Sequence, residues 1–343
     1  MDESAKKQIL NGMMDFSQSI RFRTSDQPYE LVNAAIRDNP KIAYYLHWYT
    51  IVGILGNYEL RAQYIHKDTA LSEIHTVLTK DECINTMCQF VGGFKKQLIV
   101  VAKQSVGLSN VTAEFHERHA SFYPNLTRVG AKSYHSKADY EVYEFSFEYR
   151  IGQVKLNMME QEVDNEVKRI SKLLFLPSMP VEVKIYLAHN YLASTVTYMD
   201  NDDNSLDVSY TQSAYGALIK KQCVCQGYAE AFKRLMDAAG IECDVIYGKC
   251  IGSTTLHAWN IVSLGKSDSY YHIDVTWDSS AGHPGYMYFC KPDSFFAGKR
   301  EWNKKYNHAC SGRYAVLSLA RKYVFQNKKI LKNHGIDDRI LDC

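Results

Sequence analysis

Three short segments in the second half of the chain constrain its fold most strongly, because they carry a cysteine, a histidine and an aspartate in order. The cysteine lies in Cys223-Val-Cys-Gln-Gly-Tyr-Ala229, the histidine in Leu256-His-Ala-Trp-Asn260 and the aspartate in His272-Ile-Asp-Val-Thr-Trp-Asp278. These three side chains are the ones that serve as a thiolate nucleophile, its base and the residue that orients the base. A fold that brings Cys225, His257 and Asp274 together is predicted to transfer acyl groups through a thioester.

Cys225 is predicted to begin an amphipathic helix. Apolar residues with helical spacing follow it, at Tyr228, Phe232, Leu235, Met236 and Ala239. Gly240 ends this helix as a C-terminal cap. Backbone N–H groups in the first turn lower the pKa of a thiol and can bind an oxyanion. Cys223, two residues earlier, is predicted to be structural.

His257 and Asp274 are predicted on two neighbouring strands. The sequence favours strands over Cys243–Ile251, His257–Val262 and Tyr270–Thr276. A hairpin folded about Gly265 and Lys266 sets His257 directly opposite Asp274, with Cβ atoms about 5 Å apart. A slip by one residue would turn Asp274 to the other face. His272 shares the predicted face of Asp274 and is the rival base.

Three further residues are candidates for binding the substrate or the oxyanion. Tyr215 precedes the nucleophile in Ser213-Ala-Tyr-Gly-Ala217, Gln226 follows Cys225 directly, and Trp259 lies on the face of His257. Packing in the core is the competing role for Tyr215 and Trp259.

The segment from about Val181 to Tyr288 resembles the transglutaminase-like superfamily, in the branch that contains bacterial proteins and kyphoscoliosis-type cysteine peptidases. The matching motifs are Tyr198-Met-Asp200, Ser213-Ala-Tyr-Gly-Ala-Leu218, Val224-Cys-Gln-Gly-Tyr-Ala229, Gly240-Ile241, Tyr247-Gly248, His257-Ala-Trp-Asn260 and Asp274-Val-Thr-Trp-Asp278. The resemblance implies an α+β, papain-like core, in which the nucleophile helix packs on an antiparallel sheet. It assigns Cys225 as nucleophile, His257 as base and Asp274 as orienting residue.

The resemblance implies a mechanism rather than a substrate. We expect a cysteine hydrolase, a peptidase or deamidase that acts on peptide or protein amides. A transglutaminase or cyclase with an amine acceptor is the alternative, and a catalytically silent interaction module is the third. No cofactor is required, and no metal site is predicted. Cys223, Cys225, Cys243 and Cys250 lack the paired spacing of structural zinc, and Asp200–Asn204 is predicted to be a solvated loop rather than a calcium site.

The composition limits the classes of partner and the compartment that we expect for this chain. With 40 basic and 38 acidic residues, the chain has no basic excess for nucleic acid. It contains no apolar run of about 20 residues that could span a membrane. The first residues lack the apolar core of a signal peptide, and the nine cysteines are scattered without a disulfide framework. A cytoplasmic protein is expected. The alternative is a secreted protein whose signal peptide has been removed.

The first half is predicted to be a non-catalytic α/β domain over residues 1–175, followed by the catalytic domain over 176–343. Two prolines in Leu176-Pro-Ser-Met-Pro180 mark the boundary. Residues 73–94 are predicted to form one long helix.

A tandem repeat within this domain, of about residues 1–94 and 95–175, is a further hypothesis. Tyr58-Glu-Leu60 and Tyr143-Glu-Phe145 would be equivalent, 85 residues apart. Simple alternation of strands and helices gives the same pattern, so both readings stay open.

Overall fold

The computed structural model describes residues 1–118, 125–134, 137–199, 208–252, 255–265, 270–280, 283–304, 307–312 and 315–341. The described residues form two compact units. The first contains residues 1–118 and 126–149, and the second contains Asn125 and the residues from Arg150 onward. The predicted acidic loop Asp200–Asn204 lies outside the described residues.

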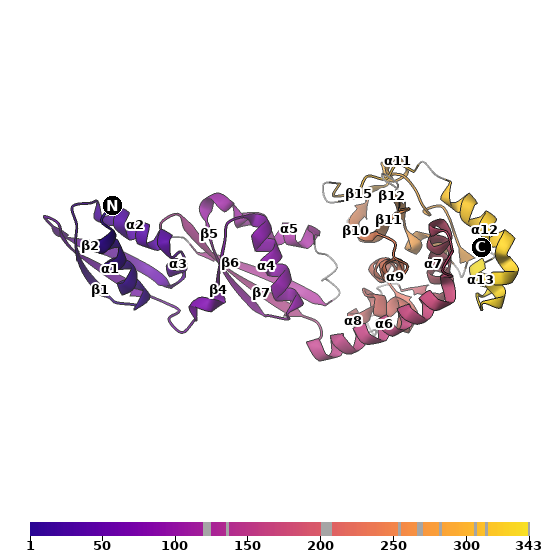
Figure 1. Ribbon diagram of the computed structural model, residues 1–343, viewed down its shortest axis with the longest axis horizontal. Coiled ribbons are helices and arrows are strands. Elements are labelled where there is room, and N and C mark those ends of the chain that lie inside the picture. Colours follow the sequence, from indigo (N-terminus) through magenta and orange to yellow (C-terminus); the bar gives the residue numbers. More distant parts are fainter. Residues whose placement is uncertain are drawn as a thin grey trace. The chain divides into compact units, whose positions relative to one another are not determined.

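The first unit contains two mixed modules of helices and strands (Figure 1). Its longer elements are α1 (Glu3–Met14), β1 (Ser19–Arg23), α2 (Pro28–Asp38), α3 (Ile42–Tyr45), β2 (Leu46–Ile54), β3 (Asn57–Tyr64), β4 (Ile74–Val77), α4 (Lys80–Gly92), β5 (Gln97–Lys103), α5 (Val111–Arg118), β6 (Leu126–Tyr134) and β7 (Tyr140–Tyr149). The strands form the sheets β1-β3-β2 and β4-β5-β7-β6.

The predicted helix over residues 73–94 is wrong in its first third. Ile74–Val77 forms β4, which pairs in parallel with β5. Helix α4 starts only at Lys80, because the Thr79 side chain caps it by accepting a hydrogen bond from the N–H of Glu82.

Both modules contain the order helix, strand, helix, hairpin, and the second adds β4 as an edge strand. The last strand of each module lies inside its sheet: β3 lies between β1 and β2, and β7 lies between β5 and β6. Both hairpins carry a register shift at the start of their first strand, after Leu46 and after Leu126. The hydroxyl of Tyr64 donates to the carbonyl of Ser17, and that of Tyr149 to the carbonyl of Lys95. These two tyrosines are 85 residues apart, as the predicted repeat requires. Its origin by duplication stays a prediction.

The second unit contains the cysteine, the histidine and the aspartate. Its elements are α6 (Gln153–Leu174), α7 (Val181–Thr195), β8 (Thr197–Tyr198), α8 (Val208–Thr211), a π-helical turn (Gly216–Lys220), β9 (Gln222–Cys223), α9 (Cys225–Ala238), β10 (Cys243–Cys250), β11 (Leu256–Ser263), β12 (Tyr270–Ile273), α10 (Val275–Asp278), β13 (Ser279–Ser280), β14 (His283–Pro284), α11 (Asp293–Phe296), β15 (Arg300–Trp302), α12 (Val316–Asn333) and α13 (Asp338–Leu341).

Helix α6 belongs to this second unit, although the sequence places the boundary after it. Its apolar face, Val163, Val167, Ile170 and Leu174, is buried in the core of the second unit together with residues of α7 and α9. An amphipathic helix is stabilised by the core that covers its apolar face, so the unit begins before α6 rather than at Leu176.

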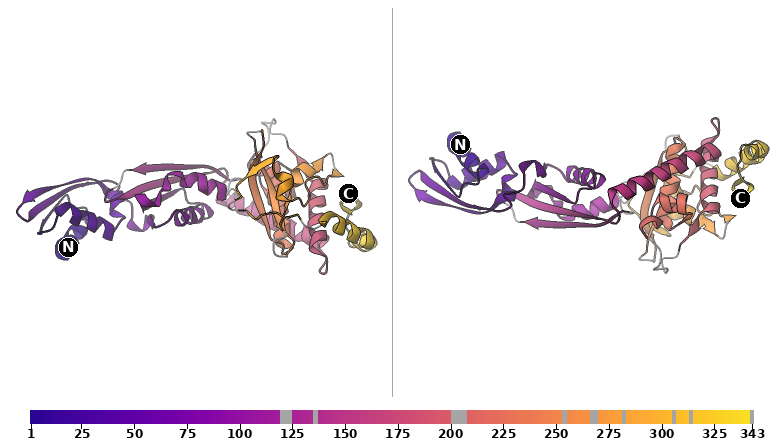
Figure 2. Two further views of the ribbon diagram at one scale, coloured as in Figure 1. Left: turned by 90° about the horizontal axis from the view of Figure 1, so that it is seen from above. Right: turned by 90° about the horizontal axis from the view of Figure 1, so that it is seen from below.

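Helix α9 lies at the centre of the second unit, against the antiparallel sheet β12-β11-β10-β15 and beside α6 and α7 (Figure 2). Tyr228, Phe232, Leu235 and Met236 are buried, as their helical spacing predicts. Gly240 has a φ of +69°, and the N–H of Ile241 donates to the carbonyl of Met236, which ends the helix as expected.

A buried polar network ties the C-terminal helix α13 to α7 and α10. His189 and Asp278 are fully buried, with 3.2 Å between His189 Nε2 and Asp278 Oδ2. The other imidazole nitrogen of His189 lies 3.1 Å from Asn190 Oδ1, which also accepts from the Tyr286 hydroxyl. The Asn190 amide donates to the carbonyl of Ile340. These partners satisfy polar groups that would otherwise destabilise the core.

Candidate active site

Cys225 is the first residue of α9, and its side chain is partly exposed. Gly227 lies in the first turn of the helix, where a β-carbon would lie 2.8 Å from the Thr211 carbonyl oxygen and 2.5 Å from Cys223 Cβ. Glycine is therefore required for this close approach. The N–H groups of the first turn of a helix have no intrahelical acceptor, so they concentrate positive potential beside the sulfur.

His257 lies on β11, and its Nε2 is 2.8 Å from Asp274 Oδ2. Both side chains are buried. The predicted strand over Tyr270–Thr276 is wrong at its end. Strand β12 stops at Ile273, and Asp274 is the N-cap of α10, accepting from the N–H of Trp277 through Oδ1.

The predicted hairpin register is also wrong, by two residues. It would pair Asn260 with Tyr271, whereas Asn260 lies opposite Ile273. A shift of two residues keeps every side chain on its face. Asp274 consequently reaches His257 from beyond the end of β12 rather than from the directly opposite position. The predicted turn at residue 266 lies outside the described residues.

The cysteine and histidine shift each other's pKa in opposite directions. Burial raises the pKa of Cys225, but hydrogen bonds from His257 and from the backbone of Ala258 bring it below its ordinary value. Burial lowers the pKa of His257, but Asp274 and Cys225 raise it to about 9. Because Nε2 faces Asp274, Nδ1 is the nitrogen left for the sulfur. Both shifts favour the thiolate–imidazolium pair over the neutral pair.

Cys225 differs in this respect from six of the other described cysteines. Burial raises the pKa of Cys83 to about 12 and of Cys88 to about 11. It also raises the pKa of Cys223, Cys243, Cys290 and Cys310.

Of the three further candidates, only Gln226 and Trp259 lie beside the cysteine–histidine pair. Trp259 is buried and stacks on the His257 ring at 5.9 Å, while its indole N–H donates to His272 Nδ1 at 3.0 Å. Tyr215 directs its hydroxyl to Glu162 on α6. Its contact is therefore with a helix that carries none of the three predicted catalytic residues.

Gln226 starts a hydrogen-bonded chain next to the sulfur that the sequence did not predict. Its side-chain amide donates to the Tyr247 hydroxyl at 3.3 Å, and this hydroxyl donates to Glu230 Oε1 at 3.1 Å. Burial raises the pKa of Glu230 to about 7, although Tyr247 opposes the shift.

Trp277 and Arg300 are two further residues that sequence reasoning missed. Trp277 is half exposed and lies edge-on to the His257 ring at 6.2 Å. Arg300 on β15 is buried and forms an ion pair with Asp274 Oδ2, the same oxygen that faces His257.

A possible metal-binding group, His272, Asp293 and Cys310, lies in the same unit. His272 Nδ1 accepts a hydrogen bond from the Trp259 indole, so it carries no proton, and Nε2 must then donate to Asp293 Oδ1 at 2.8 Å. A neutral imidazole with a protonated Nε2 has no free lone pair for an ion. The group is therefore hydrogen-bonded within itself, and His272 is not placed to act on Cys225.

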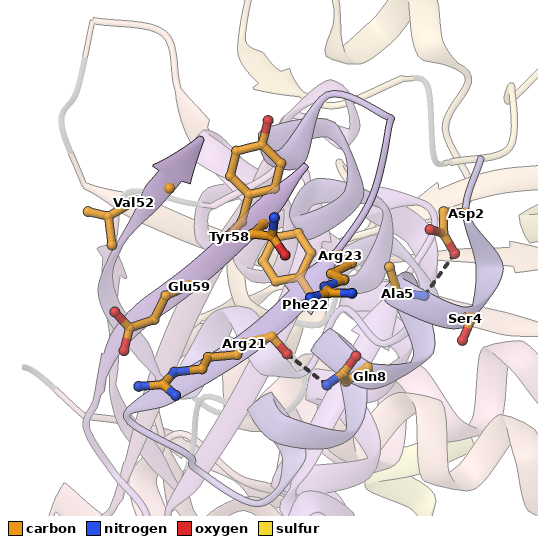
Figure 3. A pocket seen from close by; sticks show the side chains of 12 residues that line it. Asp2, Ser4, Ala5, Gln8, Arg21, Phe22, Arg23, Val52, Tyr58 and Glu59 are labelled. Carbon is orange, nitrogen blue, oxygen red and sulfur yellow. Dashed lines mark hydrogen bonds between the residues drawn. The ribbon is translucent and has the colours of Figure 1, made fainter. Parts of the chain in front are cut away.

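A hollow of about 750 Å³ lies in the first unit, at the ends of β1 and β3 and next to α1 (Figure 3). Arg21, Arg23 and Glu59 line it, and the Gln8 amide donates to the carbonyl of Arg21. The residues that line it include no cysteine and no histidine, so neither a thiol nor a serine–histidine pair is present among them.

A sequence model of the transglutaminase-like superfamily matches residues 176–275. The match includes Cys225, His257 and Asp274, and it confirms the predicted resemblance for this segment. No curated protein matches the chain. No helix in the described part of the chain is both long and apolar enough to cross a membrane.

Two solved structures are similar to part of this chain. One is described as a TGase; it is 13% identical over 65% of this chain and 62% of that chain, with a TM-score of 0.29. The other is described as a putative cysteine protease from Cytophaga hutchinsonii; it is 10% identical over 52% of this chain and 64% of that chain, with a TM-score of 0.28. The matched regions span less than two thirds of either structure's length.

Proposed function

We propose that the second unit is a cysteine enzyme of the transglutaminase-like superfamily, which forms a thioester with the acyl group of a peptide or protein amide. One observation carries the proposal: His257 lies between Asp274 Oδ2, at 2.8 Å, and the thiol of Cys225, and the pKa of the thiol falls while that of the imidazole rises. The superfamily match supports cysteine-based catalysis in general.

The reaction follows from this arrangement. The Cys225 thiolate attacks the amide carbonyl carbon, and a C–S bond forms while the oxygen becomes an oxyanion. The N–H groups at the start of α9 stabilise that charge. The C–N bond then breaks, and the imidazolium of His257 gives its proton to the leaving amine. Asp274 fixes the ring orientation and stabilises the imidazolium.

We propose water as the acceptor in the second half of the reaction. Cys225 is partly exposed, so water can reach the thioester carbon. His257 removes a proton from this water while the water oxygen forms a C–O bond with the thioester carbon. The C–S bond then breaks, which releases the carboxylic acid and returns Cys225 as a thiolate beside the protonated His257. Hydrolysis of this kind is the reaction of a peptidase or deamidase.

The first test is alkylation of Cys225 by iodoacetamide between pH 4 and 9, located by mass spectrometry. Cys88 is an internal control, because it is also partly exposed while burial raises the pKa of its thiol to about 11. We expect Cys225 to react well below pH 8, and His257→Ala to abolish this advantage. Equal reactivity of the two thiols in the wild type would refute an activated thiolate.

The second test separates water from an amine as acceptor. Peptide substrates are supplied with and without an added primary amine, and the products are identified by mass. A free carboxylate in both cases supports hydrolysis, whereas conversion to the amide only when amine is present would overturn it. Cys225→Ala should abolish the reaction and change the unfolding free energy by no more than about 1–2 kcal/mol.

We also propose a reducing compartment such as the cytoplasm, which the described cysteines support. The eight described cysteines are all free thiols, which is typical of proteins in reducing surroundings.

A further inference from the structure

Arg300 reaches the candidate active site because β15 pairs with β10. Gly248 lies opposite Trp302 in this pair. A β-carbon at Gly248 would lie 2.2 Å from the carbonyl of Glu301 and 2.7 Å from the Trp259 ring. The absence of a side chain at Gly248 therefore lets the strand approach closely enough for Arg300 to contact Asp274.

The Arg300 guanidinium is held from several sides. One nitrogen contacts Asp274 Oδ2, and Nη1 lies 2.9 Å from Cys250 Sγ. Four aromatic rings surround the cation with centroids 4.7–5.5 Å away, those of Trp259, Trp277, Tyr288 and Phe296. Aromatic faces stabilise a buried cation, so the guanidinium has one well-defined position.

The charges in this group balance only when Arg300 is included. In the reactive form, Cys225 is a thiolate, His257 an imidazolium and Asp274 a carboxylate, which together carry one net negative charge. A buried group with a net charge is costly. It would be neutralised by a proton on the thiol, which destroys the nucleophile, or on Asp274, which removes the partner of the imidazolium. The cation of Arg300 makes the total zero.

We propose that Arg300 is a positioning residue, which holds Asp274 ionised against His257 and balances the charge of the group so that Cys225 remains a thiolate. The inference rests on the proposed function of Cys225 and adds a fourth residue to it. Arg300 acts through Asp274 and does not itself contact the sulfur in this arrangement.

The other titratable groups around this cluster do not replace the cation. Asp278 on α10 is an acid with its own partner, His189. Burial lowers the pKa of His272 on β12, which keeps it neutral. Burial also raises the pKa of Tyr288, which faces Arg300, and of Tyr247 on β10, which faces Cys225.

Among the described residues, Cys223 and Cys250 are two further neighbours, and the acid Glu230 is linked to this group through Tyr247. Burial keeps Cys223, which faces Cys225, protonated. Cys250 on β10 contacts Arg300 itself and adds no positive charge. Arg300 therefore supplies the positive charge that this cluster needs.

The test is the pH dependence of Cys225 alkylation in the full chain, for the wild type, Arg300→Met and Arg300→Lys. We expect Arg300→Met to move the midpoint of the acidic limb upward by about one pH unit or more, which is about tenfold slower labelling below that midpoint. Arg300→Lys keeps the cation and should return the midpoint to within about 0.3 units of the wild type. Arg169→Met removes a cation paired with Glu166 on α6 and should leave the midpoint unchanged.

The outcomes separate the two levels of the argument. If the alkylation rate of Cys225 in the wild type shows no acidic limb below pH 8, the proposed function is refuted, whatever the Arg300 variants show. A second outcome is an activated Cys225 in the wild type and an unchanged labelling midpoint in a folded Arg300→Met variant. If only the Tm of this variant falls, Arg300 merely stabilises the fold, and the inference is refuted. If Arg300→Met does not fold, Arg300→Lys decides: a midpoint displaced by about one unit despite the retained charge would overturn the inference.

Discussion

Replacing Asp274 by Asn tests the arrangement most directly, because the change removes one charge and keeps the shape. Asn can still accept the hydrogen bond from the N–H of Trp277 that caps α10. What it loses is the negative charge 2.8 Å from His257 Nε2. The variant therefore changes the protonation of His257 without a large change in packing.

The size of the effect follows from Coulomb's law. Two unit charges about 4 Å apart interact by about 4 kcal/mol at an effective dielectric constant near 20, which corresponds to about three pKa units. We expect the pKa of His257 to fall from about 9 to its ordinary range near 6.5. Removal of the carboxylate also leaves the Arg300 cation unpaired beside His257, which acts in the same direction.

The assay is alkylation of Cys225 at pH 7, together with turnover once a substrate is known. Alkylation in Asp274→Asn should slow at least tenfold, and turnover should fall by orders of magnitude because the ring also loses its orientation. Asp293→Asn is the matched control. Asp293 Oδ1 lies at the same distance of 2.8 Å from a histidine, His272, which is on the strand β12 next to β11. A strong effect of Asp293→Asn with no effect of Asp274→Asn would refute the assignment of His257 and identify His272 as the base.

Two further predictions concern stability. Gly227→Ala places a methyl group 2.8 Å from the Thr211 carbonyl, so it should destabilise the fold by about 1–3 kcal/mol and slow Cys225 alkylation. Gly92→Ala, at the end of α4 with open space around it, should do neither. The pKa of His257 is raised above its unfolded value, from 6.5 to about 9, so its stabilising contribution is complete below pH 6.5 and is lost as pH rises through 9. The difference in urea unfolding free energy between wild type and His257→Gln should then shrink by up to about 3 kcal/mol between pH 6 and 9.5; a difference independent of pH would contradict the raised pKa.

The sequence predicted helix α9 well because the signals for it are local. Helical spacing from Tyr228 to Met236 and the glycine at 240 specify the face that is buried and the place where the helix ends. The superfamily resemblance was carried by motifs of the same local kind.

The hairpin register could not be derived in this way. It depends on how many residues the turn uses, and the composition of the turn does not fix that number. The predicted pairing was off by two residues and still placed His257 and Asp274 on one face, because the side-chain period of a strand is two.

Arg300 has no sequence signature at all. It follows Lys299 at the start of a three-residue strand, and nothing near it resembles a motif. Its role depends on the pairing of β15 with β10, some 50 residues earlier in the chain, and on the small size of Gly248. Long-range pairing of this kind can be seen only once the sheet is known.

The hydrogen bond between the Asn190 amide and the Ile340 carbonyl joins residues 150 positions apart. At about 5–20 residues per second, a ribosome delivers Ile340 roughly eight to thirty seconds after Asn190. Until then the amide on α7 has no acceptor, and contacts so far apart in the chain also form slowly. The second unit therefore completes its core only after synthesis has passed residue 340. A chain stalled during translation would carry Cys225 on an unfinished scaffold.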